Sequence, residues 1–153
     1  MTEPSPYPHA PLWRKLAALL YDSLLIAAVS MAYGSIALTL KMKILGYQLQ
    51  AGERATLGLP GLLGWITVLV LFFAFFWRRG GQTLGMRAWR LRLVNMDNQR
   101  PSWLACIARA LLAGLSFAAL GAGYWWQWLD RDHLTLHDRL SQTKVLLLPK
   151  NRK

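Results

Sequence analysis

The sequence predicts an all-α membrane protein: a small bundle of two full transmembrane helices plus a third span or re-entrant helical hairpin, with a short cytoplasmic two-stranded β element. Three observations predict this class. Hydrophobic residues make up 54% of the 153 residues and charged residues only 16%. The apolar residues form long runs. A helix needs about 20 residues to cross a hydrocarbon core of about 30 Å, and these runs are close to that length. The basic residues gather in blocks between these runs, as positive-inside loops do.

The net charge of +11 fits this class better than a nucleic-acid-binding class. A soluble basic domain would spread Lys and Arg over its surface, whereas here they flank long uncharged stretches. We therefore expect acidic lipid headgroups at a basic cytoplasmic face, and no nucleic acid, as the partner of this charge. The single cysteine, Cys106, cannot form a disulfide within the chain and is expected to be a small packing residue.

Residues 1–11 precede the first apolar run and contain four prolines, one acid and no basic residue. This composition is unlike the positively charged start of a signal peptide, and the run that follows is too long for a cleaved one. We expect a disordered N-terminal tail, followed by a transmembrane domain over residues 12–148 and a basic C-terminal tail over 149–153.

The first predicted span covers residues 16–40 and contains one charge, Asp22. A buried acid in a span costs roughly 2.5–3.5 kcal/mol on insertion scales and marks a functional site by default. Arg14 lies eight positions earlier, on the same half of the helix, and can reach towards it by snorkelling. Asp22 is therefore predicted either to bind a proton or cation, or to form a structural ion pair with Arg14 or Arg109.

A second span is predicted over residues 61–77, after a polar connection that holds Lys41, Lys43 and Arg54. Pro60 suits the first turn of this helix because its missing N–H needs no partner there. Trp65 and Trp77 are expected at the two headgroup zones.

Residues 78–102 form the most basic loop, with one acid among six arginines, and the positive-inside rule makes it cytoplasmic together with the N-terminus. Residues 89–94 alternate between apolar and basic, which predicts a short strand. Residues 143–148 form the other β-like run. We expect these two strands to pair.

The third apolar run, residues 103–129, is interrupted only by Arg109. If it crossed the membrane once, the basic C-terminal tail would lie opposite the basic loop, against the positive-inside rule. Two full crossings need more residues than this run has. The sequence therefore favours an interfacial or re-entrant hairpin turning near Gly121 and Gly123, with a plain third span as the alternative. A group of tryptophans would anchor the returning segment: Trp125, Trp126 and Trp128.

Small residues recur at every fourth position of this run, at Ala110, Gly114, Ala118 and Ala122. Such a stripe lets two helix backbones approach closely in a membrane. We expect it to serve packing within the chain, with the face of a homo-oligomer as the alternative.

Thr135 and Asp138 have the spacing of a capping box, which predicts a short helix over residues 137–141. This structural role is a simpler explanation of Asp138 than catalysis. His133 and His137 are four residues apart, but a helix beginning at Thr135 would separate them, so no metal site is predicted.

Residues 80–87 (GGQTLGMR) resemble a phosphate-binding loop, but Met86 and Arg87 stand where that motif has Lys and Ser or Thr. No catalytic constellation of residues is found. We expect no enzyme activity, cofactor or metal.

Four segments together resemble the RDD family of bacterial membrane proteins: WRKLAALLYD (13–22), GGQTLGMRAWRLRLV (80–94), the Arg-Pro-Ser step at 100–102 leading into ALLAG, and TLHDRLSQTKV (135–145). The resemblance covers most of the chain. The arginine and two aspartates that name this family map onto Arg14, Asp22 and Asp138. Departures from the family pattern are Met86 and the Ser141-Gln142 step, and neither affects the three named residues.

The resemblance implies a multi-pass protein of the inner cell membrane, and some members of this family are associated with sodium/proton antiport. Two functions follow as expectations. The first is a cation/proton transporter, or a component of one, in which Asp22 and Asp138 act and Arg14 tunes Asp22, with Arg109 and His137 as secondary site residues. Because no internal repeat is visible, transport would need a homo-oligomer. The second is a non-catalytic accessory or scaffold protein of a membrane complex.

Overall fold

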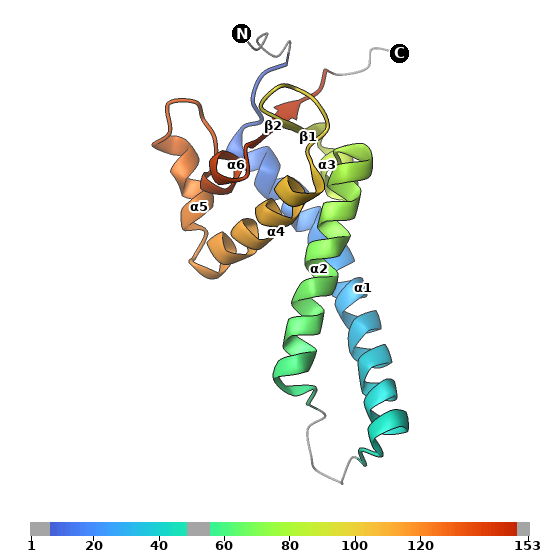
Figure 1. Cartoon of the computed structure of the whole chain (residues 1–153). Coiled ribbons are helices and arrows are strands. Elements are labelled where there is room, and N and C mark those ends of the chain that lie inside the picture. The colour runs from blue at the N-terminus through green and yellow to red at the C-terminus, as the bar shows by residue number, and fades with distance from the viewer. Residues whose placement is uncertain (1–6, 49–55, 150–153) are drawn as a thin grey trace. The chain divides into compact units, whose positions relative to one another are not determined.

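The computed structural model describes residues 7–48 and 56–149 (Figure 1). The chain forms two compact units, one made of Met1–Asp22 with Val70–Lys153 and the other of Ser23–Leu69. Two helices, α1 (Leu12–Leu45) and α2 (Gly58–Gly80), are each long and apolar enough to cross a membrane. Both predicted spans are confirmed as helices, and both extend beyond the predicted bounds at each end.

In the unit Ser23–Leu69, polar side chains hold the two helices together. The hydroxyl of Tyr33 donates to the carbonyl of Gly61 at 2.8 Å, and the indole N–H of Trp65 donates to Ser30 Oγ at 2.8 Å. A Cβ on Gly64 would overlap the Tyr33 hydroxyl, so the glycine is needed for this contact. Interhelical hydrogen bonds and small residues are typical of helices packed in a membrane, where burial of apolar surface does not drive association.

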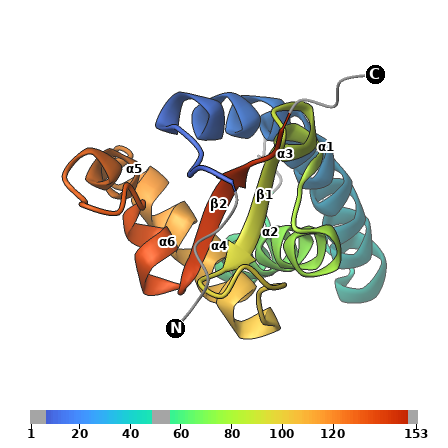
Figure 2. The same ribbon diagram turned by 90° about the horizontal axis from the view of Figure 1, so that it is seen from above.

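The other unit contains the two strands and four short helical elements. Strands β1 (Leu91–Asn95) and β2 (Thr143–Leu147) pair antiparallel with Leu91 opposite Leu147 (Figure 2). This confirms the predicted pair. Helix α3 (Leu84–Ala88) precedes β1 and helix α6 (Leu136–Leu140) precedes β2. Helix α6 forms with the predicted Thr135 capping box, one residue earlier than expected.

The end of the N-terminal segment lies beside β2. The amide of Ala10 donates to the carbonyl of Val145 at 2.9 Å, and the amide of Leu147 donates to the carbonyl of Pro8 at 2.9 Å. The predicted N-terminal tail, residues 1–11, therefore has an ordered end, because backbone pairing holds residues 8–10. Residues 1–6 and 150–153 lie outside the described residues.

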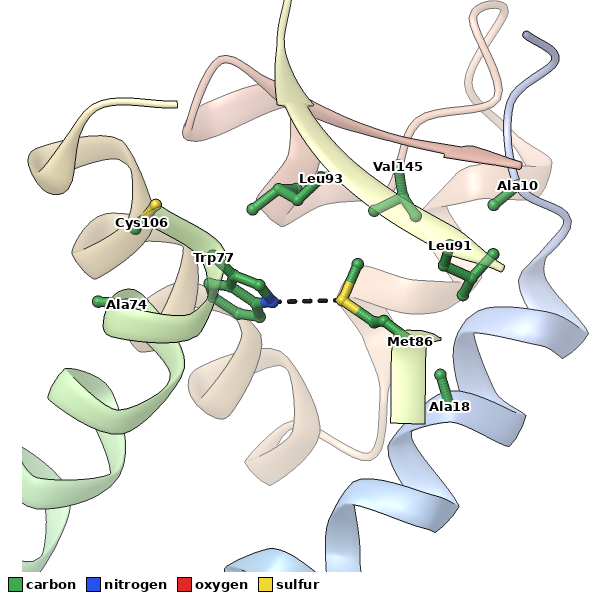
Figure 3. Close-up of a cluster of buried hydrophobic side chains, with 9 residues drawn as sticks. All are labelled: Ala10, Ala18, Ala74, Trp77, Met86, Leu91, Leu93, Cys106 and Val145. Atoms are coloured by element: carbon green, nitrogen blue, oxygen red, sulfur yellow. Dashed lines mark hydrogen bonds between the residues drawn. The ribbon is translucent and has the colours of Figure 1, made fainter. Parts of the chain in front are cut away.

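A small apolar core lies between the sheet, α2, α3 and the start of α1, and Figure 3 shows its side chains. Leu91 and Leu93 of β1 point into it, as the alternation in the sequence predicts. The indole N–H of Trp77 lies 3.3 Å from Met86 Sδ. Trp77 is only 8% exposed, so the prediction that it faces lipid headgroups is wrong. Met86 of α3 contacts its indole N–H, and the guanidinium of Arg109 lies 5.4 Å from the centre of its ring.

The third apolar run is broken. Helix α4 (Trp103–Ala118) is followed by α5 (Ala122–Trp125) and the 3-10 helix η1 (Trp126–Trp128), and the two parts are bent by 106°. The break is at the predicted place, where Leu120 and Gly121 both adopt left-handed conformations with φ of 54° and 79°. A Cβ on Gly123 would overlap Ser116 Oγ, which fixes how closely α5 returns onto α4. Among the described residues, a third crossing could be made only by this bent pair.

The stripe of small residues on α4 does not pack as expected. A Cβ added to Gly114 would meet no atom of the described residues within 4 Å, and Ala118 and Ala122 are exposed. The interpretation as close packing within the chain is therefore wrong at Gly114. Sequence spacing identifies a stripe but does not show which surface, if any, covers it.

Candidate functional site

The most buried charge in the described part of the chain is Asp138, whose exposed fraction is 0%. Its position on α6 follows from the capping box. The amide of Asp138 donates to Thr135 Oγ1 at 3.3 Å, and the amide of Thr135 donates back to Asp138 Oδ2 at 3.1 Å. This reciprocal pair satisfies two amides at the helix start and turns the carboxylate inward.

Two cations from distant helices meet the Asp138 carboxylate. Lys15 Nζ of α1 lies 2.8 Å from Oδ2, and the guanidinium of Arg109, on α4, donates to Oδ1. Both cations are buried, with exposed fractions of 8% and 6%. Arg109 also donates to Thr143 Oγ1 of β2 at 2.9 Å. The cluster of Lys15, Arg109, Asp138 and Thr143, here called the charged hub, thus joins α1, α4, α6 and β2.

The electrostatics of the charged hub keep Asp138 ionised. Burial alone would raise the pKa of its carboxyl, but the charges of Arg109 and Lys15 outweigh burial and hold this pKa well below its ordinary value. Asp138 is therefore a permanent anion at neutral pH and does not exchange protons there.

His137 lies beside the hub, and its surroundings disfavour its charged form, whereas those of Asp138 favour the charged form. It is buried, its ring packs edge-on against Tyr124 at 4.6 Å between centroids, and its Nδ1 has no hydrogen-bond partner in the described residues. Burial, together with the charge of Arg109, lowers the pKa of His137 to about 3. His137 is therefore neutral at neutral pH.

This arrangement predicts acid sensitivity. Between about pH 6.5 and 3 the unfolded chain protonates His137 and the folded chain does not, so stability falls as pH falls, by up to about 1.4 kcal/mol per pH unit. Asp138 contributes only below its ordinary pKa of 3.8. Burial also lowers the pKa of His9, so within the window from pH 6.5 to 4 the difference between the wild type and His137→Phe isolates the contribution of His137. Thermal melts in detergent across this window should show a steep slope for the wild type and a shallower one for His137→Phe. Equal slopes would contradict the assignment.

Asp22, another buried acid, is 4% exposed and binds differently. Its Oδ2 accepts from the hydroxyl of Thr83 at 2.5 Å, and its Oδ1 accepts from the amide of Gly85 at 2.8 Å. Thr83 Oγ1 also accepts from the amide of Met86 as the N-cap of α3. Asp22 thus fastens α1 to the start of α3.

The structure does not form the predicted pair of Asp22 with Arg14 or Arg109. Within residues 7–48 and 56–149, no ion pair joins Asp22 to a cation. The guanidinium of Arg14 lies 4.8 Å from the centre of the neighbouring Trp13 ring, and Arg109 binds Asp138. Lys15, one residue later, points about 100° further round the helix and takes the place expected for Arg14 in an ion pair, although with Asp138.

Asp22 also lies close to the segment that follows α2. Thr83 comes directly after the last turn of α2, which carries Arg78 and Arg79. Since Asp22 binds Thr83, it lies near the segment that follows this basic end. The first turns of α1, up to Asp22, belong to the unit that contains the sheet.

Three contributors to these contacts were not found from the sequence: Lys15, Thr83 and Gly85. Lys15 had no signal beyond its place in a basic pair, and Thr83 and Gly85 lie in the segment considered and rejected as a phosphate loop. A capping signal, Thr83 before a short helix, was available there. The two histidines are separated as expected, since His133 is exposed in a turn and His137 is buried in α6.

Two open cavities among the described residues have no acid in their walls. One, of about 540 Å³, has Pro8, His9, Gln127 and His133 in its wall. The other, of about 480 Å³, lies where α2 ends and includes Arg79 and Arg87. The carboxylates of Asp22 and Asp138 therefore do not form the wall of either cavity.

Comparison with known proteins gives one match. The model of the RDD family matches residues 9–142, which is most of the chain and includes Asp22, Arg109 and Asp138. Neither the curated proteins nor the solved structures contain a match to this chain.

Proposed function

We propose that this chain, which belongs to the RDD family, is a non-catalytic accessory protein of the cell membrane. In this proposal the buried charges hold a folded unit together at the membrane surface. Family membership and the apolar helices α1 and α2 fit an integral membrane protein. In this proposal the basic loop and both ends of the chain face the cytoplasm, as the positive-inside rule requires. The folded unit then offers its surface to lipids and to other membrane proteins.

The observation that carries the proposal is the internal use of the carboxylates of Asp22 and Asp138. The carboxylate of Asp138 accepts hydrogen bonds from Lys15, Arg109 and the amide of Thr135. The carboxylate of Asp22 accepts hydrogen bonds from the hydroxyl of Thr83 and the amide of Gly85. An acid that carries ions in a membrane faces a water-filled cavity or pathway. Here the hydrogen-bond donors come from the chain itself, which is the arrangement expected of carboxylates that stabilise the fold.

One observation favours cation/proton transport as a second candidate. Asp22 is buried without a cationic partner among the described residues, in contrast to Asp138. Such a carboxylate can take up a proton and keep its contact with Thr83, since a hydroxyl both donates and accepts. Transport by so short a chain would still need an oligomer.

The variant Asp22→Asn separates the two candidates. An asparagine can accept from the amide of Gly85 and donate to Thr83 Oγ1, so it preserves both contacts but cannot exchange a proton. Wild type and variant are reconstituted at equal density in vesicles with an imposed pH gradient, and sodium or potassium is added. We expect both to match protein-free vesicles, while an exchanging ionophore collapses the gradient.

Gradient dissipation by the wild type that is lost in Asp22→Asn would overturn the accessory proposal in favour of transport. The accessory role also makes a positive prediction. In cells that lack the chain, the abundance of at least one other membrane protein should fall and should recover with either wild type or Asp22→Asn. If no membrane protein changes in abundance, the accessory role is wrong.

A structural role for Asp22 also predicts the effect of removing its oxygens. Asp22→Ala leaves the Thr83 hydroxyl and the Gly85 amide without their partner, which costs about 1–3 kcal/mol. Thermal melts in detergent should therefore rank wild type and Asp22→Asn close together, with Asp22→Ala clearly lower. A melt of Asp22→Asn as low as that of Asp22→Ala would show that the negative charge itself is required.

A further inference from the structure

The cavity of about 480 Å³ lies in the turn between α2 and α3. Two exposed arginines line it, Arg79 from the last turn of α2 and Arg87 from α3. Phe75, Phe76 and Leu84 form its apolar side. The cavity thus combines two cations with aromatic and aliphatic surface, at the end of a helix long enough to cross a membrane.

The two arginines have no internal partner for their charge. Within the described residues, no carboxylate lies within ion-pair distance of Arg79 or Arg87. The guanidinium of Arg79 lies 5.7 Å from the centre of the Phe75 ring, a contact that leaves its N–H groups available to an anion. Guanidinium groups match the geometry of phosphate oxygens and bind them through paired hydrogen bonds.

The apolar side of the cavity indicates which phosphate fits. Phe75 and Leu84 are exposed in the described structure, although both are large hydrophobic residues. A soluble phosphate would leave these side chains in water, whereas a lipid would cover them with its glycerol backbone and upper acyl chains. Basic pockets beside the ends of transmembrane helices are typical sites for anionic headgroups.

We propose that this cavity binds an anionic phospholipid, with its phosphate between Arg79 and Arg87 and its acyl chains along Phe75, Phe76 and Leu84. The site requires α2 to cross the membrane with its basic end at the headgroup level. It does not require the accessory role, and it stands equally if Asp22 transports protons. Bound lipid would hold the turn between α2 and α3 at the membrane surface.

The test is lipid binding by the full chain, purified in an uncharged detergent and titrated with phosphatidylglycerol while bound lipid is counted by native mass spectrometry. The double variant Arg79→Gln with Arg87→Gln removes the proposed phosphate contacts. Its matched control is Arg100→Gln with Arg131→Gln, which removes the same charge from two other exposed arginines. We expect the first pair to bind about tenfold more weakly and the control pair to bind within about twofold of the wild type.

Three further arms distinguish the alternatives. Arg79→Lys with Arg87→Lys should recover only part of the affinity, because an ammonium lacks the paired donors. Inorganic phosphate at millimolar concentration should not displace the lipid. Phosphatidylcholine should bind more weakly than phosphatidylglycerol, since its headgroup carries no net charge.

Equal losses in the two glutamine pairs would mean that only overall charge attracts the lipid, and would overturn the site. Displacement of the lipid by inorganic phosphate would overturn the assignment to a lipid and indicate a soluble phosphate ligand. Both arginines are exposed, so the glutamine variants should melt within about 2 °C of the wild type. A lower melting temperature confined to the Arg79 and Arg87 pair, without added lipid, would contradict a binding role.

Discussion

Asp138→Asn should destabilise the protein by about 3–5 kcal/mol, the largest effect expected of any single polar substitution in the described residues. The amide still fits α6, but it cannot neutralise Lys15 and Arg109, which are both buried and would be left with uncompensated charge. The loss should be seen as a lower melting temperature in detergent and a reduced amount of protein in the membrane fraction.

Two controls bracket this prediction. Asp97→Asn makes the same chemical change at an exposed acid and should change stability by no more than about 0.5 kcal/mol. Lys15→Met should cost less than Asp138→Asn, because the carboxylate keeps its contact with Arg109. If Asp138→Asn melted like the wild type, the charged hub would not be what holds α1, α4, α6 and β2 together.

Gly85→Ala should have the second largest effect, a loss of about 2–3 kcal/mol. A Cβ at this position would overlap the carbonyl oxygen of Ala18 and lie 2.8 Å from Asp22 Cγ. The overlapping oxygen belongs to the backbone of α1, so no side chain can move to relieve it, and α3 must shift away from the helix. That shift also lengthens the hydrogen bond from the Gly85 amide to Asp22.

Gly114→Ala is the matched control for this substitution. It makes the same change within α4, where the added Cβ meets no atom of the described residues within 4 Å. Since alanine favours a helix over glycine by about 0.5–1 kcal/mol, this variant should melt at the same temperature as the wild type or slightly higher. A melt of Gly85→Ala as high as that of Gly114→Ala would contradict the close approach of α3 to α1.

The elements that the sequence predicted correctly depend on local patterns. Apolar runs of sufficient length identified the two long helices, alternation identified β1, and the spacing of Thr135 and Asp138 identified the capped helix α6. The break was expected near the two glycines, Gly121 and Gly123, and it lies there, although Leu120 beside them also adopts a positive φ. Each of these signals lies within a few residues of the structure it specifies.

The RDD family and its place in a membrane were likewise legible in the sequence, and the family match over residues 9–142 confirms the resemblance. Of the residues named from that resemblance, Arg14 and Asp22 lie on α1 and Asp138 lies on α6. Their contacts could not be predicted, since a motif records residue types and spacings but not the partners that packing brings to them.

Those partners were decided only by the tertiary structure. Lys15 and Asp138 are 123 positions apart, and Asp22 and Thr83 are 61 apart. Arg14 and Lys15 differ by one position, but this turns the side chain by about 100° around α1, so the choice between them depends on which face of the helix meets the sheet unit. The burial of Trp77 could not be predicted for the same reason, because Met86 and Arg109, which contact it, lie 9 and 32 positions further along the chain. The local periodicity of the sequence determines which residues share one face of a helix or strand, whereas long-range packing determines which of these faces meet.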